Sequence, residues 1–224
     1  MTRPSAVAFD VVETLFSLES LRPRLTSAGL AGHHLEIWFA SFLRDAFALE
    51  ISSDYKPFRD IAAANLSGLL EKELGRAERQ AVDHVLDGFS QLDPHDDVVP
   101  AMEALQKAGI RIATLTNGSA QVTAGLLDRA GVRQMVEHVI SIDQIGHWKP
   151  HRAVYEGCAK TLGVQPADVA LVAAHPWDIQ GARQSGLMTG YVARDGAPFP
   201  SVMKTPDFQA ESLIGLIDKI TKSG

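Results

Sequence analysis

Short apolar runs alternate with amphipathic stretches along most of the chain. The first run, residues 6–9, is interrupted abruptly by the carboxylate of Asp10, which predicts a buried parallel strand ending at Asp10. From residue 97 onward the chain alternates between predicted strands, at 110–116, 138–142, 169–173 and 188–192, and predicted helices, at 98–107, from 120, at 152–162, 179–185 and 212–220. This βαβ rhythm predicts an α/β fold with a doubly wound parallel sheet.

Residues 16–96 follow a different pattern. Apolar residues recur at i, i+3 and i+4 within residues 35–49, 61–70 and 81–89, which predicts three amphipathic helices and no strand. An all-helical block inserted directly after the first strand is typical of a cap over the strand ends. We therefore expect residues 1–15 and 97–224 to form the core and residues 16–96 to form an inserted helical cap.

The composition narrows the classes of partner. Hydrophobic residues make up 46% of the 224, and the net charge is −6 without a dense run of Lys or Arg, which argues against nucleic acid and anionic membranes and favours a small molecule. Asp10 and Glu13 precede any apolar region that could serve as a signal peptide, and no apolar stretch has the length of a membrane span. We expect a cytoplasmic protein and leave a homodimer open. Cys158 is the only cysteine, which excludes an internal disulfide.

Polar side chains follow several of the predicted strands. In open α/β sheets ligands lie outside the carboxyl ends of the strands, so these side chains are expected to share one face. They are Asp10, the run Thr116-Asn117-Gly118-Ser119, Lys149-Pro150, and His175-Pro176-Trp177-Asp178. Asp10 is the candidate nucleophile, with a turn-capping carboxylate as the alternative. For Lys149 the alternative is a solvated surface lysine.

With these segments the chain resembles the haloacid dehalogenase superfamily, whose signature elements are a strand-terminal Asp, a Ser/Thr after the second strand, a Lys and an acidic loop. Within it the nearest likeness is to the L-2-haloacid dehalogenases, on Phe9-Asp10 with Thr14-Leu15-Phe16, Thr116-Asn117-Gly118-Ser119, Lys149-Pro150 with Arg152 and Val154-Tyr155, and Trp177-Asp178 with Gly181-Ala182-Arg183. The resemblance covers nearly the whole chain. It implies a Rossmann-like core with an inserted cap and a covalent aspartyl intermediate.

The resemblance, together with the chemistry of the side chains at the positions that depart from it, gives the expected roles. The expected catalytic residues are Asp10, Thr14, Lys149, His175 and Asp178. The expected substrate-binding residues are Val12, Phe39, Arg44, Thr116, Asn117, Tyr155 and Trp177.

The chemistry of these residue types supports the assignment. An Asp carboxylate, with an ordinary pKa of about 3.9, is already ionised at neutral pH, and an adjacent Lys149 would keep it charged and oriented. Thr14, Thr116 and Asn117 offer donors that could orient the nucleophile or bind a developing anion.

Two positions separate this chain from the phosphatases of the superfamily. Val12 stands where those enzymes carry the Asp that protonates the leaving alkoxide, whereas a halide leaves unprotonated. Ala174 stands where the metal-binding phosphatases have an Asp, and magnesium requires oxygen ligands. We expect no metal and no cofactor.

Three departures from the dehalogenase pattern are also visible. Glu13 replaces the usual Gly before Thr14, and Trp38 is followed by Phe39 where the cap arginine is expected, with Arg44 farther along the same helix as a substitute. His175 replaces an Asn. We favour a role for His175 in activating the hydrolytic water, and the alternative is a loop residue that donates a structural hydrogen bond.

The main hypothesis is a metal-independent hydrolase that opens the carbon–halogen bond of a small 2-haloacid through an ester with Asp10 and inverts the attacked carbon. Two alternatives remain open: a small-molecule phosphatase with Glu13 as its acid, and a catalytically silent member that binds a ligand.

Overall fold

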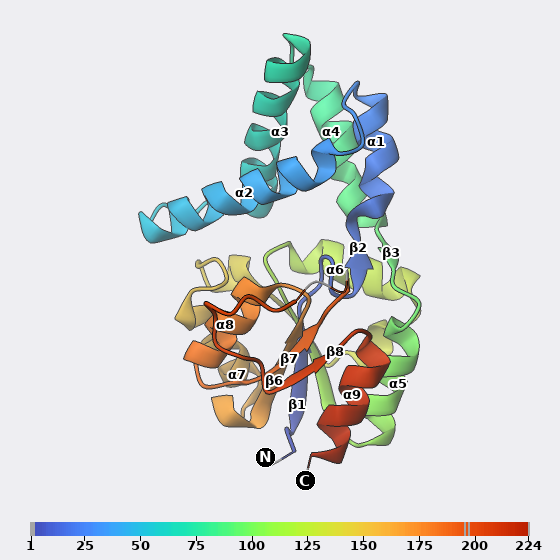
Figure 1. Cartoon of the computed structure of the whole chain (residues 1–224), viewed down its shortest axis with the longest axis vertical. Coiled ribbons are helices and arrows are strands. Elements are labelled where there is room, and N and C mark those ends of the chain that lie inside the picture. The colour runs from blue at the N-terminus through green and yellow to red at the C-terminus, as the bar shows by residue number, and fades with distance from the viewer. Residues whose placement is uncertain (1–2, 195, 197, 224) are drawn as a thin grey trace. The chain divides into compact units, whose positions relative to one another are not determined.

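The computed structural model describes residues 3–194, 196 and 198–223 (Figure 1). The chain divides into two compact units. One consists of Met1–Phe16 with Pro94–Gly224, and the other of Ser17–Asp93. We call them the core unit and the helical unit, and describe each by itself.

The core unit is built on a six-stranded parallel sheet with the order β5-β4-β1-β6-β7-β8. The strands are β1 (Ala6–Phe9), β4 (Arg111–Thr116), β5 (His138–Ser141), β6 (Val169–Ala173), β7 (Met188–Val192) and β8 (Phe208–Ala210). All four residues of β1 are fully buried, as its unbroken apolar run requires for a central strand. Phe9 pairs with Thr114 of β4 and with Val172 of β6, so these three strands end at the same edge.

Two pairs of helices flank the sheet. Helix α5 (Val98–Lys107) packs against α9 (Leu213–Lys222), and α7 (Arg152–Leu162) packs against α8 (Pro176–Gln184). Figure 1 shows the two pairs on opposite sides of the strands, and α6 (Ala120–Arg129) packs against β5. The doubly wound parallel sheet is therefore confirmed.

Some details of the core unit differ from the prediction. Strand β8 was not predicted, because three residues are too few to show a periodic pattern. Strand β1 ends at Phe9, so Asp10 is the first residue beyond it. Helix α8 begins at Pro176, three residues earlier than predicted, which puts Asp178 in its first turn. Pro suits the first turn because its missing N–H would have no helical partner there.

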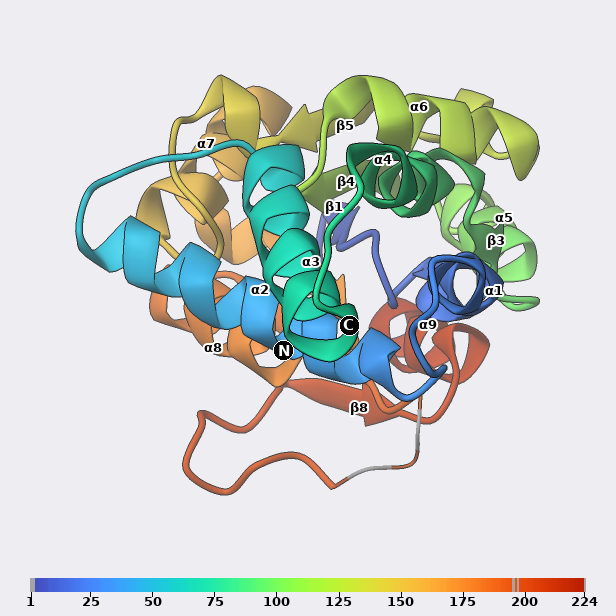
Figure 2. The same ribbon diagram turned by 90° about the horizontal axis from the view of Figure 1, so that it is seen from above.

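The helical unit contains α1 (Arg22–Ser27), α2 (His34–Ile51), α3 (Phe58–Leu74) and α4 (Arg79–Asp87). Helix α1 was not predicted. Helices α2 and α3 pack together, and α3 crosses α2 steeply in both views (Figures 1 and 2). Aromatic rings form much of the core, with Phe58 lying 4.7 Å from Phe42 and 5.0 Å from Phe89 between ring centroids.

The prediction that residues 16–96 contain no strand is wrong in one detail. Strands β2 (Phe16–Ser17) and β3 (Asp93–Pro94) pair as a two-stranded sheet where the chain leaves the core unit and returns to it. Two residues per strand leave no periodic signal. In the part of the chain that the structure describes, no helix has the length and apolar character of a membrane span.

Candidate active site

Asp10 lies directly beyond the central strand of the sheet. Its backbone N–H donates to Val172 O at 2.9 Å, which extends the ladder between β1 and β6 by one residue. The side chain is 5% exposed, and both carboxylate oxygens are held: Oδ1 accepts from Lys149 Nζ at 2.6 Å and Oδ2 accepts from Thr14 Oγ1 at 2.7 Å. A buried carboxylate with both oxygens oriented fits a nucleophile better than a turn cap.

Lys149 is fully buried, which excludes the alternative of a solvated surface lysine. Its ammonium group has three acceptors for its three N–H bonds: Asp10 Oδ1 at 2.6 Å, Asp178 Oδ2 at 2.8 Å and Leu115 O at 2.9 Å. A lysine ammonium has three donors and no acceptor, so all of its hydrogen-bonding capacity is used. The position of the charge is therefore fixed.

Asp178, in the first turn of α8, lies on the other side of the ammonium and is fully buried. Its Oδ1 accepts from Tyr155 Oη at 2.6 Å, and Tyr155, on α7, is itself fully buried. Tyr155 was expected to bind the substrate. The structure places its hydroxyl on Asp178, so it orients this carboxylate.

The pKa values of Asp10 and Asp178 are shifted in opposite directions. Burial by itself would raise the pKa of Asp10, but the charges of Lys149 and His175 outweigh it and hold that pKa below its usual value. Burial raises the pKa of Asp178; Lys149 acts against this, Asp10 adds to it, and the pKa stays above its usual value. Paired carboxyl groups whose environments separate their pKa values are typical of sites that need one permanent anion and one proton acceptor.

Lys149 and Tyr155 keep their protons in this environment. Burial would lower the pKa of Lys149, but the charges of Asp10 and Asp178 outweigh it and raise that pKa, so the ammonium stays charged. Burial and the adjacent Asp178 raise the pKa of Tyr155 well above its usual value, so the phenol stays a donor.

Residues 11–16 form a tight turn behind the nucleophile. The N–H groups of Leu15 and Phe16 both donate to Val11 O, at 2.9 and 3.0 Å. Glu13 has a φ of 64°, in the left-handed region where Gly is favoured. This backbone conformation explains why the dehalogenase pattern has Gly at this position. Thr14 Oγ1 accepts from Ala174 N at 2.9 Å while it donates to Asp10, so it links the end of β6 to the nucleophile.

His175 lies next to the nucleophile. Its Nε2 is 3.8 Å from Asp10 Oδ2 and 3.1 Å from Val12 O, and its ring stacks on Trp177 with centroids 5.0 Å apart. A carbonyl oxygen only accepts, so the Nε2 that faces Asp10 carries a proton and donates to Val12 O. In this arrangement that nitrogen is not a base. The ring of Trp177 also lies 5.8 Å from the ammonium of Lys149.

Thr116 is the last residue of β4, and Asn117 follows it at the same edge of the sheet. Thr116 Oγ1 accepts from Gly118 N at 2.9 Å, and Asn117 Oδ1 accepts from the backbone N–H of Lys149 at 3.0 Å. Asn117 thus fixes the loop that carries Lys149. Contacts therefore connect most of the predicted site residues of the core unit, whereas the hydroxyl of Thr116 contacts its own loop. The connected residues are Asp10, Val12 through its carbonyl, Thr14, Asn117, Lys149, Tyr155, His175, Trp177 and Asp178.

The two other predicted residues, Phe39 and Arg44, belong to α2 in the helical unit. The Arg44 side chain is 70% exposed, and its Nε donates to Asp45 Oδ1 at 2.7 Å beside a groove of about 390 Å³ between α2 and α3. Phe39 is half-buried, with its ring 5.9 Å from that of Phe42. Their roles in substrate binding stay predictions.

The residues at the carboxylate pair do not fit a magnesium site. The carboxylates of Asp10 and Asp178 converge on the Lys149 ammonium, so a cation of the chain itself lies between them. Magnesium requires oxygen ligands in near-octahedral geometry, and Val12 and Ala174 supply no side-chain oxygen.

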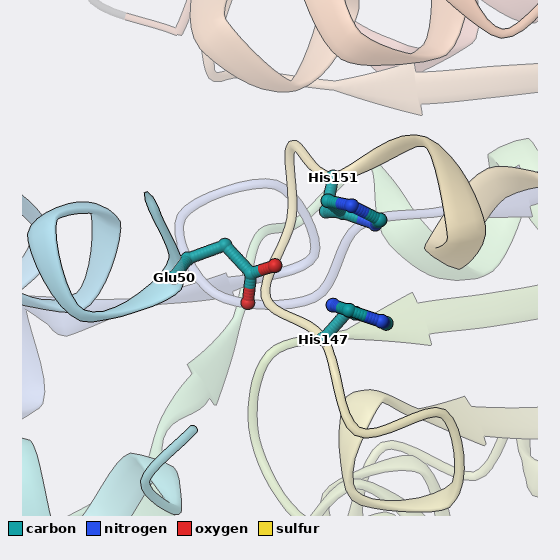
Figure 3. Close-up of side chains that lie close together, drawn as sticks. All are labelled: Glu50, His147 and His151. Atoms are coloured by element: carbon teal, nitrogen blue, oxygen red, sulfur yellow. The ribbon is translucent and has the colours of Figure 1, made fainter. Parts of the chain in front are cut away.

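Two histidines flank Lys149 in the sequence. The rings of His147 and His151 stack with centroids 4.0 Å apart and planes inclined by 10° (Figure 3). The lone pairs of an imidazole lie in the ring plane, so stacked rings do not direct them toward one point. His151 Nδ1 accepts from Ala153 N at 3.2 Å, which caps α7. This geometry is that of a helix start and differs from that of a chelating pair.

Sequence reasoning missed two residues around the turn. His95 Nε2 donates to Glu13 O at 3.1 Å, and Arg194 Nη2 donates to Thr14 O at 2.7 Å. Arg194 comes shortly after the end of β7, so the rule that located the other residues could have found it. His95 carries no such signal.

Comparison with known proteins gives consistent matches over the chain. The family model of haloacid dehalogenase-like hydrolases matches residues 4–186. An (S)-2-haloacid dehalogenase of Pseudomonas sp. (strain YL) is 27% identical over 215 residues, which cover 95% of this chain and 92% of that protein. Haloacetate dehalogenase H-2 of Moraxella sp. (strain B) is 26% identical over 222 residues, 98% of this chain and 99% of that protein.

The fold is shared with solved structures. The L-2-haloacid dehalogenase from Xanthobacter autotrophicus with chloropropionic acid covalently bound superposes with a TM-score of 0.88 at 23% identity, over 99% of this chain and all of that one.

Proposed function

Because the chain belongs to the haloacid dehalogenase-like hydrolase family, we propose that it hydrolyses the carbon–halogen bond of a small 2-halogenated carboxylate through an ester with Asp10. The observation that carries the proposal is the buried Lys149 ammonium, which joins the carboxylates of Asp10 and Asp178. It keeps the nucleophile ionised without a metal and holds the second carboxylate next to it.

In the first step an oxygen of Asp10 attacks C2 of the substrate from the side opposite the halogen. The new C–O bond forms as the carbon–halogen bond breaks, the halide leaves with its electron pair, and the carbon is inverted. A halide is a weak base and leaves without a proton, so Val12 in place of an acid is no obstacle. The lowered pKa of Asp10 keeps the nucleophile charged throughout the physiological range.

In the second step water attacks the carboxyl carbon of the Asp10 ester. Asp178 takes a proton from this water, and Lys149 stabilises the negative charge that develops on the carbonyl oxygen. Collapse breaks the bond between the carboxyl carbon and the ester oxygen, and Asp178 returns its proton to the departing alkoxide oxygen. The other proton of the water passes to solvent, so the products are the 2-hydroxy acid and the Asp10 carboxylate. One oxygen of Asp10 leaves with the product and an oxygen from water replaces it.

We assign the base to Asp178 and a positioning role to His175. The Nε2 that faces the nucleophile donates to Val12 O, which is the structural hydrogen bond left open as an alternative. The raised pKa of Asp178 makes it a stronger proton acceptor than an ordinary carboxylate.

The test is a parallel assay on 2-chloropropionate, fluoroacetate and para-nitrophenyl phosphate, with and without magnesium. We expect halide release from a 2-haloacid without added metal, with inversion at C2. A single turnover in ¹⁸O water should label Asp10 and leave the first product unlabelled. Magnesium-dependent phosphate release would instead support a phosphatase with Glu13 as acid, and no turnover at all would support a ligand-binding member.

We propose that the helical unit is a cap, with Phe39 and Arg44 contributing to substrate binding; Arg44→Gln should then raise the KM more than it lowers kcat. A cytoplasmic location and a homodimer stay predictions, and light scattering checks the second.

A further inference from the structure

The turn after the nucleophile is held from outside at four successive carbonyl groups. Its backbone belongs to no helix, so these oxygens need other donors. The donors are His175 Nε2 to Val12 O (3.1 Å), His95 Nε2 to Glu13 O (3.1 Å), Arg194 Nη2 to Thr14 O (2.7 Å) and His95 N to Leu15 O (2.9 Å). The bond from Arg194 is the shortest of the four, and its donor carries a permanent charge.

Arg194 is anchored on its other side. Its Nη1 donates to Asp97 Oδ2 at 2.9 Å, and the same oxygen accepts from the backbone N–H of Leu213 at 2.8 Å. Both side chains of this ion pair are 14% exposed. A guanidinium is planar and rigid, so fixing one nitrogen on Asp97 also fixes the direction of the other toward Thr14.

Arg194 binds the same residue, Thr14, that contacts the nucleophile. Thr14 uses its hydroxyl to orient Asp10 Oδ2 at 2.7 Å and its carbonyl to accept from Arg194. The preceding residue, Glu13, is in the left-handed region, where a side chain costs about 1–2 kcal/mol. The turn therefore depends on its tethers to keep this conformation.

We propose that Arg194 is a positioning residue for the nucleophile, acting through the Thr14 carbonyl and held in place by Asp97. This inference rests on the proposed function for its catalytic readout. Arg194 contributes to the alignment of Asp10 with the carbon it attacks, and a misplacement of about 1 Å at a reacting group lowers rates by about a hundredfold.

A matched control lies in the same unit. Arg183 forms an ion pair with Asp207, which also accepts from the backbone N–H and the hydroxyl of Thr189. This pair resembles Arg194–Asp97 in having a carboxylate that also holds backbone. None of these contacts involves residues 10–16. Arg183→Gln therefore removes a comparable ion pair without touching the turn.

The experiment compares Arg194→Ala and Arg183→Gln on 2-chloropropionate. We expect Arg194→Ala to lower kcat by about 10- to 100-fold while KM changes less than about threefold. Low millimolar guanidinium chloride should restore part of the lost kcat, and the same concentration of sodium chloride should not. Arg183→Gln should keep kcat within about threefold. A purely structural role for Arg194 would lower the melting temperature of Arg194→Ala and leave kcat of its folded fraction unchanged, and this result would overturn the proposal.

A second readout needs no substrate. Hydrogen–deuterium exchange of peptides covering residues 11–16 should be at least several-fold faster in Arg194→Ala than in Arg183→Gln. If the wild-type protein turns over no 2-haloacid, the proposed function fails. Hydrogen–deuterium exchange then still tests whether Arg194 holds the turn. Equal exchange in the two variants would overturn the positioning role of Arg194.

Discussion

Replacing Tyr155 by Phe removes one hydroxyl group and leaves the charges of the site unchanged. That hydroxyl donates to Asp178 Oδ1 at 2.6 Å, inside a fully buried environment, and it lowers the pKa of Asp178 against the effect of burial. A hydrogen bond to a charged group contributes about 1.5–3 kcal/mol, so its loss favours the protonated form of Asp178. Without the hydroxyl, the pKa of Asp178 should therefore rise further above its usual value.

The sign of the kinetic effect follows from the proposed role. Asp178 must be ionised to accept a proton from water, so ester hydrolysis falls as the pH drops through its pKa. The Tyr155 hydroxyl lowers that pKa, so Tyr155→Phe should move the acidic limb of the profile to higher pH. At pH values well above the limb, the rate should change little.

The assay is the pH dependence of single-turnover hydrolysis, with halide release and 2-hydroxy acid formation followed separately. Tyr191→Phe is the control, because Tyr191 is a buried tyrosine of β7 whose ring packs on Phe199. Its acidic limb should stay in place. An acidic limb that does not move in Tyr155→Phe, or that moves to lower pH, would refute the assignment of Asp178 as the base.

Four further outcomes are expected. Asp10→Asn should lower turnover by at least about a thousandfold with an unchanged circular dichroism spectrum, and turnover near the wild-type rate would contradict the nucleophile. EDTA should leave activity intact, because Lys149 already neutralises the carboxylates. Loss of activity on chelation and its recovery with magnesium would contradict a metal-independent mechanism. His175→Asn keeps a donor for Val12 O and should not shift the acidic limb, whereas accumulation of the ester would restore His175 as the base. Glu13→Gly relieves a left-handed residue at a cost in chain entropy and should stabilise the fold by about 0.5–1 kcal/mol in urea unfolding; destabilisation would mean that the Glu13 side chain holds the turn.

The sheet could be predicted because its strands are buried on both sides. Such strands appear as unbroken apolar runs, and β1, β4 and β6 are examples. The short paired strands β2 and β3 and the strand β8 could not be predicted. Each has too few residues to show an alternation of apolar and polar positions. The early start of α8 follows from Pro176, which apolar spacing alone does not register.

The site was predictable wherever a side chain follows a strand end. Asp10, Lys149 and Asp178 meet because parallel strands bring their carboxyl ends to one edge. The orientation of Tyr155 toward Asp178 was not predictable, since it depends on how α7 packs against α8. Arg194 itself could have been noted, because it follows the end of β7, but its role was not predictable, because it binds the backbone oxygen of Thr14, which no residue type marks.

The charges of the site also connect the two steps of the proposed mechanism. In the free protein the negative charge of Asp10 is one of the causes that raise the pKa of Asp178. Ester formation removes that charge, and Lys149 then has only one ionised partner instead of two. Both changes lower the pKa of Asp178, so formation of the ester itself favours the ionised base that the second step needs. A fixed ammonium between two carboxyl groups can therefore support the nucleophile first and the base afterwards without moving.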